Sequence, residues 1–139
     1  MSMTKESIHP LSGSQFIEDL GVKLLDWKDG ASTIELEVVK RLSNRLGMAH
    51  GGVISTLLDQ VMGLAWRSLG NDRIPGGTIN LNVNFIAPGN GILKANGRLI
   101  RFTKSSAFCE GDVVDEMGNI IATAQGVFSA RLNVKTTTD

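Results

Sequence analysis

The most regular helical pattern in the sequence lies between Met48 and Leu69. With successive side chains 100° apart, its apolar residues fill a wide arc, which predicts a mostly buried helix. The remaining arc is narrow and holds mainly small or polar residues, namely Gly52, Ser55, Thr56, Asp59, Gln60, Gly63 and Arg67. It is not crowded with the charged side chains of a solvated face, so we expect another surface to approach it closely. An ordinary solvated stripe is the alternative.

Strand-like alternation dominates the chain after this helix. Residues 78–87 place an apolar side chain at every second position. The other face of this segment carries three Asn residues, Asn80, Asn82 and Asn84. Asn is a poor strand former, so this face is expected to meet another strand or a polar cleft. Further strands are predicted at 92–102, 107–114 and 120–132.

A short helix and a hairpin are predicted before the long helix. Ser12 or Ser14 can cap the short helix, and Gly21 can close it. Strands at 22–27 and 32–39 are joined by the turn Lys28-Asp29-Gly30. Residues 40–49 and 70–77 are predicted loops. The pattern therefore predicts an α+β fold in which an antiparallel sheet of five or six strands covers one long helix.

Composition indicates one domain over residues 1–139. The chain is 42% hydrophobic, which is enough to bury a core, and we expect flexibility only at the ends, 1–11 and 133–139. Fourteen basic residues balance fourteen acidic residues. This balance argues against nucleic acid or a membrane surface as a partner.

Cysteine usage and hydropathy indicate a cytoplasmic protein. A single cysteine, Cys109, allows no intrachain disulfide and fits a reducing compartment. It has no nearby His, so we assign it to packing. The first ten residues contain no apolar run typical of a signal peptide, and the long helix is too short and too interrupted to span a bilayer. No metal-spaced cluster is present, and His9 is isolated.

A His50-Gly51-Gly52 turn opens the long helix. The first amides of a helix lack internal partners and lie at the positive end of its dipole, so they can hold an anion or a developing oxyanion. A tight helix entry without a ligand is the alternative. Asp59 is the only acid of this helix and lies nine residues after His50, which corresponds to roughly 13 Å along the axis. If both belong to one site, the amides come from a second copy of the chain.

Asn44, the His50-Gly51-Gly52 turn and Asp59 together resemble the hotdog-fold acyl-CoA thioesterases of the phenylacetic-acid-degradation type. The segments 77–88 and 115–128 fit strands of that family in the same order, and the resemblance covers residues 15–131. It implies hydrolysis of an acyl-CoA thioester to a free acid and coenzyme A. It also implies a homodimer or homotetramer with a shared site, and no metal or redox cofactor beyond the coenzyme A of the substrate.

The resemblance also implies roles for individual residues. Asp59 acts as general base on water or attacks as the nucleophile. Gly51, or else Gly52, polarises the thioester carbonyl with help from Asn44. Thr78 orients the attacking water. Without the resemblance, Asn44 is better interpreted as a turn residue and Thr78 as a surface residue.

Two further features bear on substrate binding. His50 is expected mainly to shape the turn that receives the substrate. Arg98, Arg101 and Lys104 place three cations around one strand end, where they could clamp the phosphates of coenzyme A. A solvated edge that discourages strand pairing is the alternative.

Two other functions are the alternatives. A hotdog hydratase or dehydratase needs a His at the reacting carbon, and this chain lacks the Pro-rich segment that follows that His. A non-catalytic acyl-CoA-binding protein would not need Asp59, Asn44 and Gly51 together, and no appended DNA-binding segment is present. The identity of the acyl group cannot be inferred from the sequence.

Overall fold

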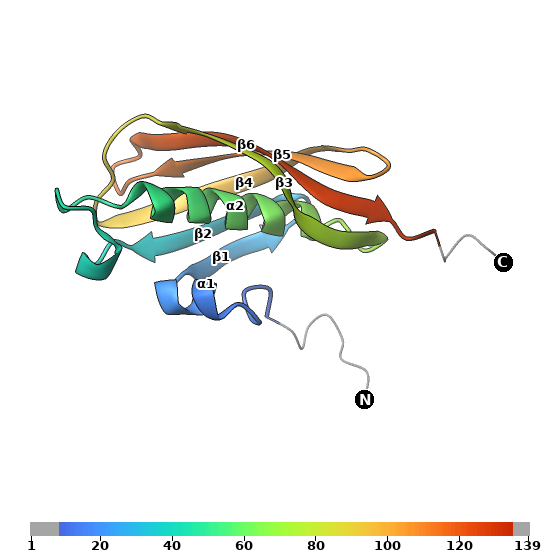
Figure 1. Cartoon of the computed structure of the whole chain (residues 1–139), viewed down its shortest axis with the longest axis horizontal. Helices are drawn as coiled ribbons and strands as arrows, with labels where there is room; N and C mark the ends of the chain where they lie inside the picture. Colours follow the sequence, from blue (N-terminus) through green and yellow to red (C-terminus); the bar gives the residue numbers. More distant parts are fainter. Residues whose placement is uncertain (1–8, 135–139) are drawn as a thin grey trace.

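A six-stranded antiparallel sheet lies over one long helix in the computed structural model, which describes residues 9–134 (Figure 1). In chain order the elements are α1 (Gln15–Leu20), β1 (Lys23–Lys28), β2 (Ala31–Glu37), the 3₁₀ turn η2 (Lys40–Leu42), α2 (Gly51–Arg67), β3 (Arg73–Phe85), β4 (Ile92–Phe102), β5 (Ser106–Val114) and β6 (Ile120–Leu132). The strand order is β1-β2-β4-β5-β6-β3, so β1 and β3 form the edges. The predicted α+β architecture is confirmed.

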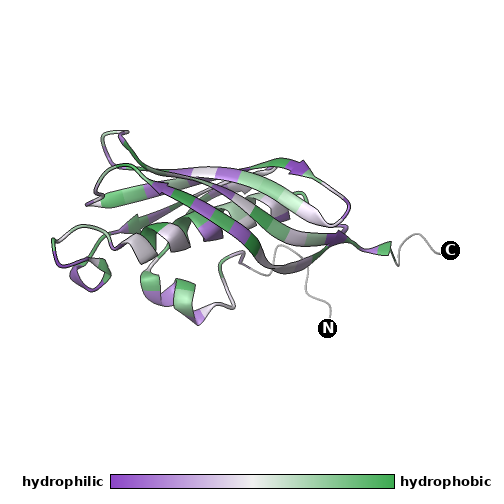
Figure 2. Cartoon of the chain, turned by 45° about the horizontal axis from the view of Figure 1, so that its top comes forward, coloured by the Kyte–Doolittle hydropathy of each residue, from purple (hydrophilic) through white to green (hydrophobic). Residues whose placement is uncertain are grey.

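The long helix α2 is mostly buried, as its wide apolar arc predicted. It packs against β4, β5 and β2. Its buried side chains include Ile54, Leu57, Leu58, Val61, Met62, Leu64 and Trp66. Along the strands, hydrophobic and hydrophilic residues alternate (Figure 2). The buried apolar side chains of the strands pack with those of α2 in one core.

Two local predictions before α2 are also confirmed. The side chain of Ser14 caps α1 by accepting a hydrogen bond from the Ile17 amide, and Gly21 closes the helix in the left-handed conformation. In the hairpin turn, Asp29 and Gly30 both have positive φ, 55° and 80°. Asp and Gly are residues that tolerate this conformation, which is why the Asp-Gly pair directs the turn here.

A row of small residues lets α2 approach the sheet closely. Ser32, Gly97 and Gly111 lie side by side on β2, β4 and β5. The buried Ser32 hydroxyl donates a hydrogen bond to the Val61 carbonyl of α2 at 2.6 Å. A Cβ atom added at Gly97 would lie 2.6 Å from the same carbonyl oxygen. The position of α2, and of every side chain it carries, therefore depends on these small residues.

Gly97→Ala is expected to destabilise the fold strongly. The added methyl group meets backbone atoms of α2, which cannot rotate away, so the helix must shift, and overpacking of this kind costs about 1–3 kcal/mol or more. Chemical unfolding followed by circular dichroism measures the effect. Gly77→Ala is the matched control, because a Cβ atom there meets nothing within 4 Å. Equal unfolding free energies for the two variants would contradict the close approach.

The start of β3 differs from the prediction. Residues 70–77 were expected to form a loop, but β3 begins at Arg73 and its first residues pair with the end of β6. Pro75, Gly76 and Gly77 are poor strand formers, which is why the pattern predicted a loop. Pairing with β6 overrides that propensity, and Pro75 is tolerated because β3 is an edge strand with irregular register at this point.

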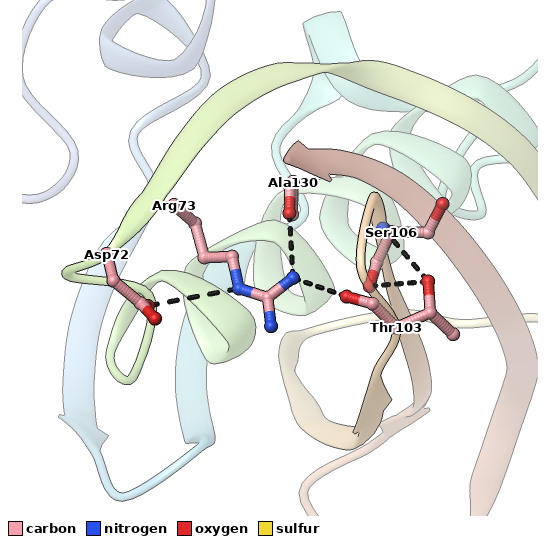
Figure 3. A network of polar contacts seen from close by, with 5 residues as sticks. All are labelled: Asp72, Arg73, Thr103, Ser106 and Ala130. Carbon is pink, nitrogen blue, oxygen red and sulfur yellow. Dashed lines mark hydrogen bonds and ion pairs between the residues drawn. The ribbon is translucent and has the colours of Figure 1, made fainter. Parts of the chain in front are cut away.

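Arg73 anchors this first part of β3 (Figure 3). Its side chain is only 10% exposed. One Nη atom donates hydrogen bonds to the carbonyls of Thr103 and Ala130, and the guanidinium lies 4.2 Å from the centre of the Phe102 ring. A single buried cation thus ties the beginning of β3 to the β4–β5 turn and to β6.

The chain ends are described only in part. Residues 1–8 and 135–139, which include most of the segments expected to be flexible, lie outside the described residues. Leu11, also in the first of those segments, packs into the core at 7% exposure. In the part of the chain that is described, no helix has the length and apolarity needed to cross a membrane.

Candidate active site

Asp59 and Thr78 meet between α2 and β3. The Thr78 hydroxyl donates a hydrogen bond to Asp59 Oδ1 at 2.7 Å. The other carboxylate oxygen of Asp59 accepts no hydrogen bond from a described residue. Asp59 itself is half-buried. The carboxylate is thus held in one orientation by one oxygen, while the second oxygen is available to a substrate or a water molecule.

Two cavities meet at this carboxylate. One, of about 460 Å³, extends towards Phe16 and Ile17 of α1. The other, of about 200 Å³, extends towards the end of α2 and the first part of β3. Asp59, Gln60 and Thr78 line both. Thr78, which the family resemblance assigned to orienting the attacking water, is therefore hydrogen-bonded to Asp59 in a concave site.

At the start of α2, His50 is the N-cap residue. Its Nδ1 atom accepts a hydrogen bond from the Gly52 amide at 2.8 Å. The Gly51 amide has no acceptor among residues 9–134. Sequence reasoning left the choice between Gly51 and Gly52 open. In this geometry Gly51 carries the available donor, whereas the Gly52 donor is occupied by His50.

Asn44 shapes the loop in front of this helix start. Its side-chain oxygen accepts hydrogen bonds from the amides of Leu46 and Met48, at 2.9 and 3.1 Å. This is the turn role that the sequence alone favoured. The side-chain NH₂ group of Asn44 has no acceptor among the described residues, so it remains free to donate. One side chain can therefore hold the loop and offer a donor.

The helix start and Asp59 do not come together within one chain. Gly51 lies eight residues before Asp59, which is roughly 12 Å along a straight helix. Neither cavity at Asp59 is lined by Asn44, His50 or Gly51. The predicted catalytic residues thus form two separate groups in the single chain, Asp59 with Thr78 and Gly51 with Asn44.

The three predicted cations do not share one cavity. Arg98 forms an ion pair with Glu110 across β4 and β5, on the sheet face opposite α2. Arg101 is exposed near the end of β4. Lys104 lies in the β4–β5 turn and lines a cavity of about 430 Å³ together with Ile74. Among the described residues, neither Arg101 nor Lys104 forms an ion pair.

Sequence reasoning placed Arg67 on the polar arc of the helix without a role. In the structure its side chain lines the smaller cavity together with Asp59, and its Nε atom donates a hydrogen bond to the Gly63 carbonyl at 3.1 Å. Burial lowers the pKa of Arg67, and the negative charge of Asp59 raises it. The spacing of Asp59, Gly63 and Arg67, two turns on one helical stripe, is the signal that could have identified it.

Cys109 packs in the core, as predicted. It is 1% exposed, and burial raises the pKa of its thiol to about 12. The group is therefore protonated and inert at neutral pH. Within residues 9–134, no three His, Cys, Asp or Glu side chains are grouped as a metal site.

The sequence profile of the thioesterase superfamily matches residues 46–122, a segment that includes the start of α2, Asp59 and Thr78. The chain belongs to the thioesterase superfamily. Two curated relatives illustrate the similarity. A Halobacterium salinarum protein named as an esterase is 33% identical to this chain over 100 residues, which cover 68% of this chain and 66% of that protein. The 1,4-dihydroxy-2-naphthoyl-CoA hydrolase of Listeria monocytogenes is 26% identical over 106 residues, covering 75% and 85%.

Two solved structures share this fold. A mutant of the phenylacetic acid degradation protein PaaI from Thermus thermophilus is 26% identical and covers 86% of this chain and 100% of that one, with a TM-score of 0.76. A Streptococcus mutans protein bound to acetyl-CoA is 26% identical and covers 80% and 89%, with a TM-score of 0.73. The hotdog fold and the resemblance to the phenylacetic-acid-degradation type are confirmed.

Proposed function

We propose that this protein is an acyl-CoA thioesterase, which hydrolyses an acyl- or aryl-acyl-CoA ester to a free acid and coenzyme A. The observation that carries the proposal is the Asp59 carboxylate. It is oriented by Thr78 through one oxygen, has its other oxygen free, and lies where two cavities meet. A fixed carboxylate in such a place can act on a thioester carbonyl without a cofactor.

The proposed reaction divides the work between two groups of residues. The Gly51 amide and the Asn44 side-chain NH₂ donate hydrogen bonds to the thioester oxygen, where negative charge develops. Asp59 takes a proton from a water molecule that attacks the carbonyl carbon. The carbon–sulfur bond then breaks, and the coenzyme A thiolate leaves and is protonated. If Asp59 instead attacks directly, a mixed anhydride forms and water hydrolyses it in a second step.

The two groups require two chains. Gly51 and Asp59 are separated along α2, so the proposed site is formed between copies of the chain. The free edge of β3 is the surface that supports this assembly, because it exposes Ile79 and Phe85 at 61% and 59%. Edge strands with exposed apolar side chains are pairing surfaces. Asn82 and Asn84, on the face that the sequence singled out, instead line a cavity on the side of the sheet opposite α2, together with Thr123 and Gln125.

Similarity to proteins of known ligand supports the substrate class. The Listeria relative is named as a hydrolase of a CoA ester, and the Streptococcus mutans structure contains acetyl-CoA. A hydratase or dehydratase is less well supported, because His50 is used as the cap of α2 and lies far from Asp59. A binding protein without catalysis would have no use for the oriented carboxylate.

The function is tested with purified protein and a panel of alkyl- and aryl-CoA esters. We expect release of free coenzyme A, detected with a thiol reagent, to follow enzyme concentration and to vary with the acyl group. Addition of water to an unsaturated acyl-CoA without release of thiol would instead indicate a hydratase. Tight binding of the esters without turnover would indicate an acyl-CoA-binding protein.

Neutralising Arg101 and Lys104 together, as Arg101→Gln and Lys104→Gln, is expected to raise KM for CoA esters more than it lowers kcat. These cations would bind the phosphates of coenzyme A equally well in the ground state and in the transition state. Losing that uniform binding raises KM and leaves kcat nearly unchanged. The effect should vanish with thioesters of a truncated thiol that lacks the nucleotide. Lys28→Gln, on the far edge strand β1, is the charge control. Equal losses with full and truncated substrates would assign the two cations a structural role.

A further inference from the structure

The smaller cavity at Asp59 ends in a cation. Its walls come from α2, from the first part of β3 and from Phe128 of β6. Asp59 lies at one end and Arg67 at the other, two helical turns later. Arg67 bends back along the helix, because its Nε atom is hydrogen-bonded to the Gly63 carbonyl. The guanidinium therefore lies about one turn from the carboxylate, roughly 6 Å along the axis.

The space between these two charges is kept open by glycine. Gly63 lies between Asp59 and Arg67 on the same stripe of α2 and contributes no side chain. A Cβ atom added at Gly63 would contact the Phe128 ring at 3.6 Å and the Arg67 Nη2 atom at 3.9 Å, so it would project into the passage that joins the two ends. The facing wall on β3 is formed by Gly76 and Gly77, which also lack side chains.

The Arg67 guanidinium has N–H groups that donate no hydrogen bond to a described residue. Its only hydrogen bond to a described residue uses Nε, and neither Nη atom has an acceptor within residues 9–134. It forms no ion pair with a described carboxylate. Burial lowers the pKa of Arg67, and the charge of nearby Asp59 offsets only part of this, without an ion pair between the two. A guanidinium fork with two free Nη groups, at the end of a lined passage, matches the geometry of a carboxylate.

We propose that Arg67 binds a carboxylate at the far end of the acyl chain, so that the preferred substrates are short acyl-CoA esters whose acyl group ends in a carboxylate. This inference rests on the proposed thioesterase function and names its substrate class. The thioester carbonyl lies at Asp59, the methylene groups pass the Gly63 stripe against Phe128, and the terminal carboxylate accepts hydrogen bonds from the Nη atoms of Arg67. Arg67 is exposed, so with a neutral acyl group of the same length its Nη donors bind only water.

The test compares esters that differ only in the terminal group. Succinyl-CoA is paired with butyryl-CoA, and glutaryl-CoA with pentanoyl-CoA, and kcat/KM is measured for each. We expect the parent protein to prefer the carboxylated member of a pair. Arg67→Met should lower that preference by roughly 10- to 100-fold, the usual effect of a hydrogen bond to a charged group, while the neutral ester changes by no more than about threefold. Arg67→Lys should retain part of the preference. Arg131→Met is the control, because Arg131 is exposed like Arg67 but does not line this cavity, and it should leave the ratio unchanged.

Each outcome separates this inference from the proposed function. Hydrolysis of both esters with the same ratio in the parent and in Arg67→Met would overturn the carboxylate site and leave the thioesterase function intact. A parallel loss on both esters would make Arg67 a residue that merely supports Asp59, which also overturns the site. Failure of the parent protein to release coenzyme A from any ester of the wider panel would overturn the function itself.

Discussion

Asp59→Asn is expected to lower kcat for CoA-ester hydrolysis by a factor of at least roughly 10²–10⁴, the usual contribution of general-base catalysis. The amide has the shape of the carboxylate but can neither take a proton from water nor attack the carbonyl. The hydrogen bond from Thr78 can still be accepted by the amide oxygen, so the local packing should persist. Steady-state kinetics on the best ester of the panel measures the loss.

Binding and assembly should survive this substitution. CoA-ester affinity is expected to stay within a few-fold of the parent, and sedimentation should give the parent's size. Asn44→Ala should reduce kcat less, because the Gly51 amide would still polarise the carbonyl. A folded Asp59→Asn protein of unchanged size that hydrolyses thioesters at the parental rate would place Asp59 on a solvated stripe and end the mechanism.

Mixing two inactive variants should restore activity if the site is shared between chains. Gly51→Pro removes the amide donor at the first helical position, where proline is well tolerated. The preceding His50 already has the extended conformation that a following proline requires, with φ −62° and ψ 141°. Loss of one such donor typically costs roughly 10²–10³ in kcat. Both Gly51→Pro and Asp59→Asn proteins should therefore fold and be nearly inactive alone.

Co-refolding of the two variants is expected to recover about one quarter of the parental activity, because half of randomly paired dimers are mixed and each mixed dimer has one intact site of two. Asp59→Asn mixed with Thr78→Val is the control. Asp59 and Thr78 lie in the same chain, so no pairing of these two variants restores an intact site. Absence of recovery in the first mixture, with mixed dimers demonstrated, would show that one chain holds the whole site.

The periodicity of apolar residues predicted those helices and strands whose own propensity agrees with the packing around them. The long helix, the Asp-Gly hairpin and the strands 92–102 and 120–132 all carry a clear repeat of apolar positions. The start of β3 was missed for the opposite reason. Its Pro75-Gly76-Gly77 segment has no strand propensity, and it becomes a strand only because β6 pairs with it and Arg73 anchors it.

The candidate site was predictable only as far as it depends on spacing along one element. Asp59 and the helix start were visible in the sequence, whereas the Arg98–Glu110 pair depends on the register between β4 and β5, which is irregular between Leu99 and Arg101. Hydrogen bonds decide between Gly51 and Gly52, and no pattern of residue types reports them. Arg67 was in the right arc, but the direction of its side chain could not be inferred.

In the proposed dimer, the irregular register of β3 would limit how two chains can pair. Its pairing with β6 shifts twice, between Pro75 and Thr78 and again between Thr78 and Asn80. These bulges divide a long exposed edge into two short lengths, which limits indiscriminate pairing with unrelated strands. The two bulges also mark fixed positions along the edge of β3. If the two β3 strands of a dimer slipped by one residue against each other, the apolar side chains of one strand would lie on the opposite face from those of the other. Only one alignment therefore matches both the bulges and the apolar faces of the two strands.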